Sequence, residues 1–274
     1  MAQPLPHVTF GGSGVKWLID SGATKTLLKE KLSRKMPRLR ITGKAARHEV
    51  HGLNASRKLN ILPFIWKASG TPNISGYLIR EHAAIGLLGY DGVIGLNTLV
   101  SSHAVMYPMS NRLRWNLNAG AYPSKRSVRL ERHPNSGHLL ARCRWQGESL
   151  LFLIDTGAAR SLFSYESAQM KGVPVGKQTH LRVFGAHASK AAAFKMPPLL
   201  MSLGSEQGEV KRTATLIATD LRTVNRALSP SGDLKIDGIL GYDFISRQCE
   251  FIDFGGRVMI LARSHLKTTR STSL

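Results

Sequence analysis

The sequence predicts an all-β protein made of two similar lobes, and three observations support this prediction. An apolar run that ends in Asp-Ser/Thr-Gly-Ala occurs at Asp20 and again 135 residues later at Asp155. Two further blocks recur in the same order behind each copy. Much of the remaining chain consists of short apolar runs separated by Gly, Asn and Pro, which is typical of β-strands and turns. We infer an internal duplication whose unit is a whole lobe, because its period is far too long for a solenoid.

The recurring blocks indicate what each lobe contains behind its acidic turn. Residues 50–56 (VHGLNAS) match residues 183–189 (VFGAHAS), and residues 91–99 (DGVIGLNTL) match residues 237–245 (DGILGYDFI). We call residues 91–99 and 237–245 the late blocks, and we expect them to be structural and to pack behind the acidic turns. The predicted domains are a first lobe at 1–118, a linker at 119–137 that is rich in Gly, Pro, Ser, Lys and Arg, and a second lobe at 138–274.

The first lobe is expected to consist of short strands with few helices. Its first two strands, 8–10 and 15–19, flank a glycine-rich hairpin turn. Helical turns follow at 29–35 and end near Pro37, because proline disfavours a helical residue before it. The other expected elements are strands near 39–41, 48–51, 59–66, 76–85 and 92–95, a helix at 96–102, and closing strands near 104–107 and 113–117.

The second lobe should repeat this plan after the linker. Its expected elements are a hairpin of strands at 138–144 and 150–154, a helix near 165–170, strands near 181–184, 194–203 and 210–218, a late helix at 242–247, and closing strands at 249–254 and 257–261. The last residues, 264–274, read as a frayed tail.

The chain is strongly basic, with a formal net charge of +21 from 38 Lys and Arg against 17 Asp and Glu in 274 residues. The basic residues are densest at 25–47 and 125–132. These stretches fit solvated loops and helix faces, or a surface that makes weak, sequence-independent contact with nucleic acid. The sequence contains no zinc knuckle and no aromatic-rich RNA-binding pattern.

The composition also indicates in which compartment of the cell the protein is expected. Hydrophobic content of 42% is that of a globular protein, and no apolar run approaches the roughly 20 residues of a membrane-spanning helix. The first ten residues contain neither a basic leader nor an apolar signal core. We expect Cys143 and Cys249 to be free buried thiols in a reducing, cytoplasmic compartment. Neither a metal nor a cofactor is expected, since His48-Glu49 lacks the spacing of a zinc site.

The two acidic turns carry the predicted chemistry. Burying Asp20 or Asp155 at the end of an apolar strand is unfavourable unless the charge is compensated. If the two lobes bring them together, like charges cannot both ionise easily, so the pair keeps one proton and titrates as a unit. One carboxyl group then acts as a base on a water molecule and the other as an acid, with no metal and no covalent intermediate.

The residues after each aspartate fit this arrangement. Ser21 and Thr156 place a small hydroxyl beside each carboxylate, and Gly22 and Gly157 allow close backbone approach. Together with Ala23, Ala158 and the recurring downstream blocks, these motifs resemble the retropepsin family of aspartic proteases, in the form found in LTR-retrotransposon polyproteins. The resemblance spans nearly the whole chain, as a single-chain tandem of two retropepsin-like β-barrel lobes with the active site at their interface.

The resemblance implies an aspartic endopeptidase that processes a retrotransposon Gag-Pol-type polyprotein, within the cell or in virus-like particles. Asp20 and Asp155 would be catalytic, and Ser21 and Thr156 would exchange hydrogen bonds between lobes. An extended peptide would bind as an added strand beneath two flaps. The flap and substrate-binding residues implied are His51, Gly52, Leu53, Phe184, Gly185 and Ala186. The chain is expected to be a monomer whose lobes pair internally.

The sequence departs from the family after the acidic motif. Retroviral members often carry an acidic residue there, paired with an arginine near the late helix, whereas Lys25 and Arg160 stand near these positions. Positive charge at the rim of the cleft would lower the apparent pKa values of the Asp20–Asp155 pair, the dyad, and would favour acidic residues in the substrate. Two alternatives to the protease are a catalytically idle scaffold of the same fold and a basic module associated with nucleic acid.

Overall fold

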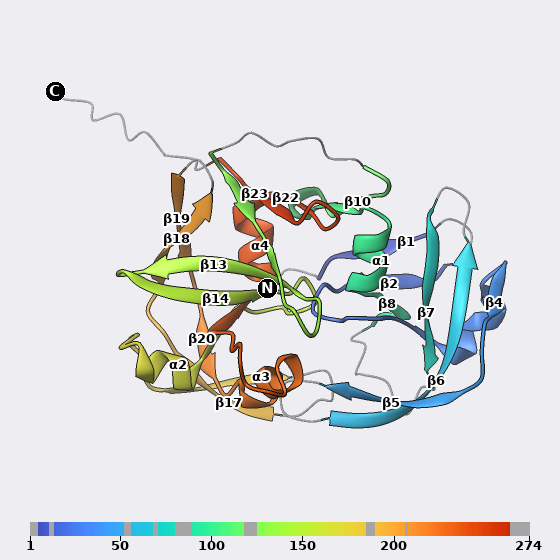
Figure 1. The fold of residues 1–274 in the computed structure, drawn as a ribbon, viewed down its shortest axis with the longest axis horizontal. Coiled ribbons are helices and arrows are strands. Elements are labelled where there is room, and N and C mark those ends of the chain that lie inside the picture. The colour runs from blue at the N-terminus through green and yellow to red at the C-terminus, as the bar shows by residue number, and fades with distance from the viewer. Residues whose placement is uncertain are drawn as a thin grey trace.

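The computed structural model describes residues 5–10, 14–51, 56–67, 71–79, 89–117, 125–184, 190–205 and 208–263. Three β-sheets make up most of this part of the chain, with a few short helices packed beside and between them (Figure 1). Two of the sheets each belong to one lobe, and the third joins the lobes. The prediction of a mainly β, two-lobed protein is therefore confirmed.

The first lobe is built on an eight-stranded sheet with the order β1-β2-β8-β3-β7-β6-β4, in which β5 also pairs with β6. Its strands are β1 (His7–Thr9), β2 (Lys16–Ile19), β3 (Thr26–Lys29), β4 (Leu39–Ile41), β5 (Ala46–His51), β6 (Ser56–Lys67), β7 (Asn73–Ile79) and β8 (Gly92–Ile94). A 3-10 helix, η1 (Glu30–Lys35), and the helix α1 (Leu96–Ser101) lie at the two expected places.

The second lobe has a ten-stranded sheet with the order β16-β17-β20-β15-β21-β14-β13-β18-β19, to which β12 adds by pairing with β13. Its strands are β12 (Glu131–Arg132), β13 (Leu139–Trp145), β14 (Glu148–Ile154), β15 (Leu162–Ser164), β16 (Gln178–Phe184), β17 (Lys190–Lys195), β18 (Leu199–Ser205), β19 (Gly208–Ala214), β20 (Ile217–Thr219) and β21 (Gly238–Leu240). Its helices are α2 (Tyr165–Met170), α3 (Arg222–Leu228) and α4 (Tyr242–Gln248).

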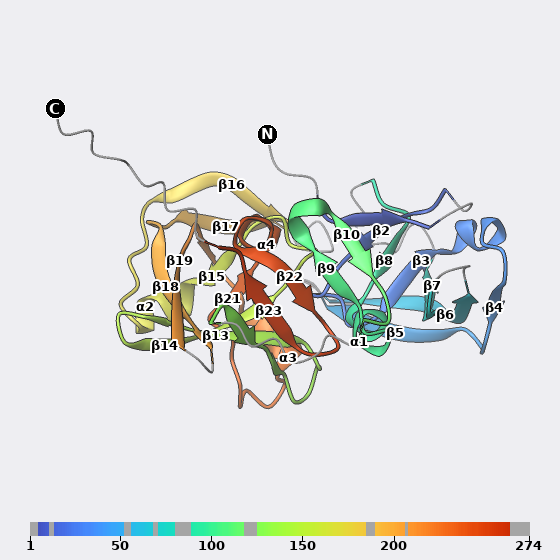
Figure 2. The ribbon, with the colours of Figure 1, turned by 90° about the horizontal axis from the view of Figure 1, so that it is seen from above.

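A five-stranded sheet with the order β10-β9-β22-β23-β11 joins the lobes (Figure 2). Its strands are β9 (Val105–Tyr107), β10 (Arg112–Arg114), β11 (Ser127–Arg129), β22 (Cys249–Asp253) and β23 (Val258–Leu261). A short 3-10 helix, η3 (Pro108–Ser110), separates β9 from β10. Met106 of β9 stands opposite Ile252 of β22, and both side chains are fully buried. One hydrophobic core therefore extends through both lobes, and each lobe also has a smaller cluster of its own.

The centre of each lobe repeats one strand arrangement. In the first lobe β2 runs parallel to β8, which pairs antiparallel with β3. In the second lobe β14 runs parallel to β21, which pairs antiparallel with β15. A glycine sits against an aromatic ring in both copies: Gly92 against Trp17, and Gly238 against Phe152. A side chain at either glycine would collide with the ring, so the recurring glycine follows from close packing.

Several elements differ from the prediction. The single strand expected at 194–203 is wrong, because Pro197 and Pro198 lie between β17 and β18 and proline cannot donate a ladder hydrogen bond. The strand expected at 210–218 is likewise divided into β19 and β20, and β3, β15 and α3 were not predicted. Residues 127–129 and 131–132, within the expected linker, form strands; Val128 in the first strand and Leu130 between the two are buried.

Both cysteines are free and buried, as expected. Burial raises the pKa of the Cys143 thiol to about 12, and it also raises the pKa of Cys249, so both thiols stay protonated at neutral pH. Among the described residues, no helix is long and apolar enough to cross a membrane.

Candidate active site

Each acidic turn leaves its central strand in the same way. The backbone N–H of Asp20 donates to the carbonyl of Ile94 on β8 at 3.0 Å, and that of Asp155 donates to Leu240 on β21 at 3.1 Å. Each carboxylate then accepts hydrogen bonds from the N–H groups two and three residues ahead, at 2.9 and 3.0 Å in both lobes. The sheet and the turn together fix both carboxylates.

The two turns meet at the interface between the lobes. The carboxyl groups of Asp20 and Asp155 hydrogen-bond to each other. Gly22 faces the carboxyl group of Asp155, and Gly157 faces that of Asp20, so closely that a Cβ at either glycine would overlap the carboxyl atoms. Only a residue without a side chain fits at these two positions.

Ser21 and Thr156 lock the two turns together by reciprocal hydrogen bonds, and both side chains are fully buried. The Ser21 N–H donates to Thr156 Oγ1 at 3.0 Å, and the Thr156 N–H donates to Ser21 Oγ at 3.1 Å. The hydroxyls in turn donate across the interface, Ser21 to the Ile154 carbonyl and Thr156 to the Ile19 carbonyl, each at 2.8 Å. All four donors are satisfied only when both lobes are present.

The electrostatics of the pair follow from this geometry. Burial raises the pKa of Asp20 well above its usual value, and the negative charge of Asp155 raises it further. Burial also raises the pKa of Asp155, against the lowering effect of the Gly157 N–H and the hydrogen bond from Asp20. The pair therefore retains a proton at pH values where isolated aspartates have lost theirs.

The raised pKa values predict how stability depends on pH. Because the folded protein holds a proton that the unfolded chain has released, the dyad's contribution to stability is complete below the unfolded carboxyl pKa of about 3.9 and is lost as pH rises through the raised folded value. Asp155→Asn should therefore raise the Tm relative to the wild type, by an amount that grows from pH 4 towards neutrality. Thermal unfolding of both proteins across this range tests it; a Tm difference independent of pH would contradict it.

The late blocks pack directly behind the acidic turns, as predicted. The N–H of Leu96 donates to the Ala23 carbonyl, and that of Tyr242 donates to the Ala158 carbonyl, each at 2.7 Å. Gly95 and Gly241 contact the backbones of Lys25 and Arg160 too closely for any side chain. The glycines of these blocks are thus required for α1 and α4 to approach the turns.

The other predicted site residues fall in two groups. Lys25 and Arg160 are exposed and immediately follow the two acidic turns. Gly52, Leu53, Gly185 and Ala186 lie outside the described residues, as do the side chains of His51 and Phe184. The antiparallel hairpins that lead to them are described: β5 pairs with β6 as far as His51 opposite Ser56, and β16 pairs with β17 as far as Phe184 opposite Lys190.

One buried residue beside the turns was missed by the sequence analysis. His138, which directly precedes β13, places Nε2 at 2.9 Å from the Gly22 carbonyl of the other lobe. Nothing in its own segment indicates this, because the contact joins residues 116 positions apart. In the described part of the chain, no group of three or more His, Cys, Asp or Glu side chains could hold a metal ion.

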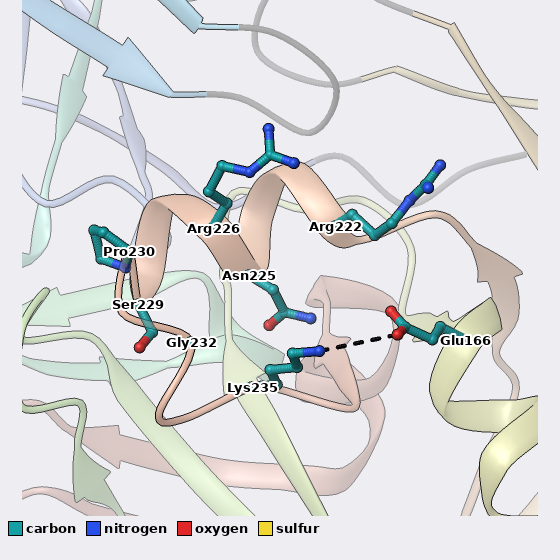
Figure 3. A pocket seen from close by; sticks show the side chains of 8 residues that line it. All are labelled: Glu166, Arg222, Asn225, Arg226, Ser229, Pro230, Gly232 and Lys235. Carbon is teal, nitrogen blue, oxygen red and sulfur yellow. Dashed lines mark ion pairs between the residues drawn. The ribbon is translucent and has the colours of Figure 1, made fainter.

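The unpredicted helix α3 also lies close to the acidic turns. Leu221, which precedes the helix, and Leu228 within it share a core cluster with Leu153 and Ala158, and α3 contacts β5 of the first lobe. A pocket beside α3 is lined by Glu166, Arg222, Asn225, Arg226, Ser229, Pro230, Gly232 and Lys235 (Figure 3). The one ion pair between two of these lining residues joins Lys235 Nζ to Glu166 Oε1 at 3.9 Å. It is solvent-exposed, so it contributes about 0–1 kcal/mol to stability. Neither aspartate of the dyad lines this pocket.

Comparison with solved structures identifies the fold. The structure matches an aspartic proteinase from Irpex lacteus with a TM-score of 0.51 and 16% sequence identity, covering 93% of this chain and 91% of that one. The chain has the aspartic proteinase fold. A retropepsin-like aspartic protease from Rickettsia conorii matches with a TM-score of 0.31 and 24% identity, over 49% of this chain and 87% of that one. No family model and no curated protein sequence matches the chain. In the aspartic proteinase fold of this chain, the two acidic turns lie at the junction of the lobes.

Proposed function

We propose that this protein is an aspartic endopeptidase in which Asp20 and Asp155 form the catalytic pair. The observation that carries the proposal is the reciprocal pairing of the two acidic turns, which brings two carboxyl groups with raised pKa values into hydrogen-bond contact. Groups with strongly shifted pKa values, held in place by a network that spans two lobes, are typical of acid–base catalysis.

The proposed reaction is the direct attack of water on a peptide carbonyl. The ionised carboxylate takes a proton from a water molecule held between the two acids, and the protonated partner donates its proton to the carbonyl oxygen. As the resulting tetrahedral diol collapses, one carboxyl group gives its proton to the leaving nitrogen and the other takes a proton from a diol hydroxyl. The C–N bond breaks, the C=O bond re-forms, and each carboxyl group recovers its original protonation state. Gly22 and Gly157 keep the carboxyl groups within reach of the same water.

The proposed substrate is an extended peptide that adds a strand between the dyad and the hairpins β5–β6 and β16–β17. Main-chain hydrogen bonds would hold it, and alternate side chains would enter pockets. His51, Gly52, Leu53, Phe184, Gly185 and Ala186 are assigned to the tips of these hairpins by the repeat in the sequence. The processing of a retrotransposon-type polyprotein is a narrower proposal, which rests on the sequence resemblance. We also propose that one chain forms the site alone, because Ser21 and Thr156 pair within it.

A cleavage assay tests the proposed function. The purified chain is incubated with a diverse peptide mixture between pH 3 and 8, with and without pepstatin, and the products are identified by mass spectrometry. We expect pepstatin-sensitive endoproteolytic cleavage. Absence of any cleavage together with salt-dependent retention of RNA would favour the alternative, a basic module that binds nucleic acid, while absence of both would favour an idle scaffold.

Lys25 and Arg160 provide a prediction about specificity. Both are exposed, carry positive charge and adjoin the acidic turns, so they should attract acidic side chains of the substrate. We expect a cleavage-site profile with a preference for Asp or Glu, and we expect Lys25→Ala combined with Arg160→Ala to reduce that preference several-fold. Lys29→Ala with Arg144→Ala serves as a charge-matched control. A wild-type profile without acidic preference, or one unchanged in the double variant, would contradict the prediction.

A further inference from the structure

His138 is fixed at the lobe interface by the turn that precedes it. The His133 N–H donates to the His138 carbonyl at 2.8 Å, and the Gly137 N–H donates to the His133 carbonyl at 2.9 Å. Gly137 has a φ of +75°, a left-handed conformation that suits glycine. The turn thereby presents the His138 ring to the other lobe, with only 7% of the residue exposed to solvent.

Both ring nitrogens of His138 have partners. Nε2 lies 2.9 Å from the Gly22 carbonyl, and because a carbonyl only accepts, Nε2 carries the hydrogen. Nδ1 lies 2.8 Å from Ser136 Oγ, which can donate to the neutral ring or accept from the charged one. The contact with Gly22 therefore persists in both protonation states, whereas the charge on the ring changes.

The Gly22 residue joins His138 to the dyad. The Gly22 N–H donates to Asp20 Oδ1 at 2.9 Å, and the Gly22 carbonyl accepts from His138 at 2.9 Å. The Cα of Gly22 faces the Asp155 carboxyl group. The second lobe thus contacts the acidic turn of the first lobe at two places: through Thr156, which binds Ser21, and through His138, which binds Gly22. A displacement of Gly22 would move a donor to Asp20 and open the space beside Asp155.

We propose that His138 is a positioning residue that holds the acidic turn of the first lobe through Gly22, and that at acidic pH its ring becomes a cation that helps to keep one carboxyl group of the dyad ionised. This inference rests on the proposed function, in which that carboxylate is the base. The ring nitrogens contact Ser136 and Gly22, so the ring acts on the dyad through Gly22 and through its charge.

The charges around His138 support the proposed effect of its cationic ring on the dyad. Burial lowers the pKa of His138, while the Gly22 carbonyl and the charge of Asp155 raise it and His133 opposes them. In return, the charge on His138 lowers the pKa of Asp155. The titratable groups around the ring are thus Asp155 of the facing dyad, Asp20 beyond Gly22, and His133 of its own turn. The ring is neutral at pH 7 and gains its charge on the acidic side.

Two substitutions separate positioning from packing. His138→Gln places an amide N–H near the position of Nε2 and cannot titrate, whereas His138→Leu fills the space without a donor. We expect the Leu variant to lose about tenfold in kcat, the equivalent of one ordinary hydrogen bond, with little change in KM. The Gln variant should recover most of kcat near neutrality, while the acid limb of its pH–rate profile moves to higher pH because the cation is missing.

The results that overturn the proposal are equally specific. It fails if Gln is no better than Leu, if both variants keep the wild-type rate, or if the acid limb of the Gln variant is unchanged. It also fails if activity falls only in proportion to a loss of folded protein, measured by Tm under assay conditions.

A second measurement does not depend on catalysis. The pKa of His138 is followed by NMR of ring-labelled histidine in the wild type and in Asp155→Asn, and its signal is assigned by its absence in His138→Gln. We expect the pKa to fall in Asp155→Asn, because the negative charge facing the ring is removed; an unchanged or higher pKa would contradict the coupling. If the wild type cleaves nothing but this shift is seen, the proposed function fails while the contact between His138 and the dyad stands.

Discussion

Asp155→Asn and Asp20→Asn should each abolish peptide cleavage, with kcat reduced by at least the ~10²–10⁴-fold that general acid–base catalysis contributes. Asparagine keeps the size of the side chain and can accept from the Gly157 or Gly22 N–H, so the turns should stay in place. It cannot take a proton from water. Steady-state kinetics on both variants, with Asp243→Asn of the late block as a matched control outside the dyad, measures the effect. A single variant that retains more than about a tenth of wild-type kcat would remove its aspartate from the mechanism.

The same pair of variants tests whether one chain suffices. Because Ser21 and Thr156 of a single chain complete each other's hydrogen bonds, each variant should be inactive as a monomer, and an equimolar mixture should stay inactive. Chain mass in solution is measured alongside activity by light scattering. Recovery of activity in the mixture would instead show that lobes from two chains exchange and rebuild an intact site.

Thr156→Ala should have the largest effect on stability. It leaves the buried Ser21 N–H without its acceptor and the Ile19 carbonyl without its donor. An unpartnered buried polar group costs about 1–3 kcal/mol, so we expect the free energy of unfolding to fall by about 2–5 kcal/mol and activity to fall with it. Urea unfolding, with the midpoint and slope fitted together, measures the change.

Thr156→Ser is the matched control for this experiment. It keeps the hydroxyl and removes only a methyl group, so most of the stability and the activity should remain. A loss as large as that of the alanine variant would show that packing of the methyl group, and not the hydrogen bonds between the lobes, determines stability at this position.

The acidic turns and the late blocks could be predicted from the sequence because their chemistry is local. A carboxylate at the end of an apolar strand, a hydroxyl beside it and a glycine after it are recognisable without knowing the fold. Their repetition made the pairing of Asp20 with Asp155 the simplest arrangement. The glycines of the late blocks were also predictable, although the reason for them, contact with the backbones at Lys25 and Arg160, required the structure.

The missed elements are those that depend on distant contacts. The strands β3 and β15 are only four and three residues long, too short to show an alternating pattern. The helix α3 begins at Arg222, after Leu221, whose side chain makes no capping hydrogen bond, and it is stabilised by packing against Leu153 and Ile239. His138 contacts Gly22 only after the lobes have come together, so no pattern near residue 138 could indicate it.

The joining sheet has a consequence for whether either lobe can exist alone. Strand β9 of the first lobe pairs with β22 of the second lobe, so Val105 and Met106 of a first lobe made alone would have no neighbour on that side. Ser21 would also have no Thr156 to accept from its N–H. An apolar strand edge left open in this way can pair with another chain. The separate first lobe is therefore expected to aggregate, whereas the full chain covers this edge with its own second half.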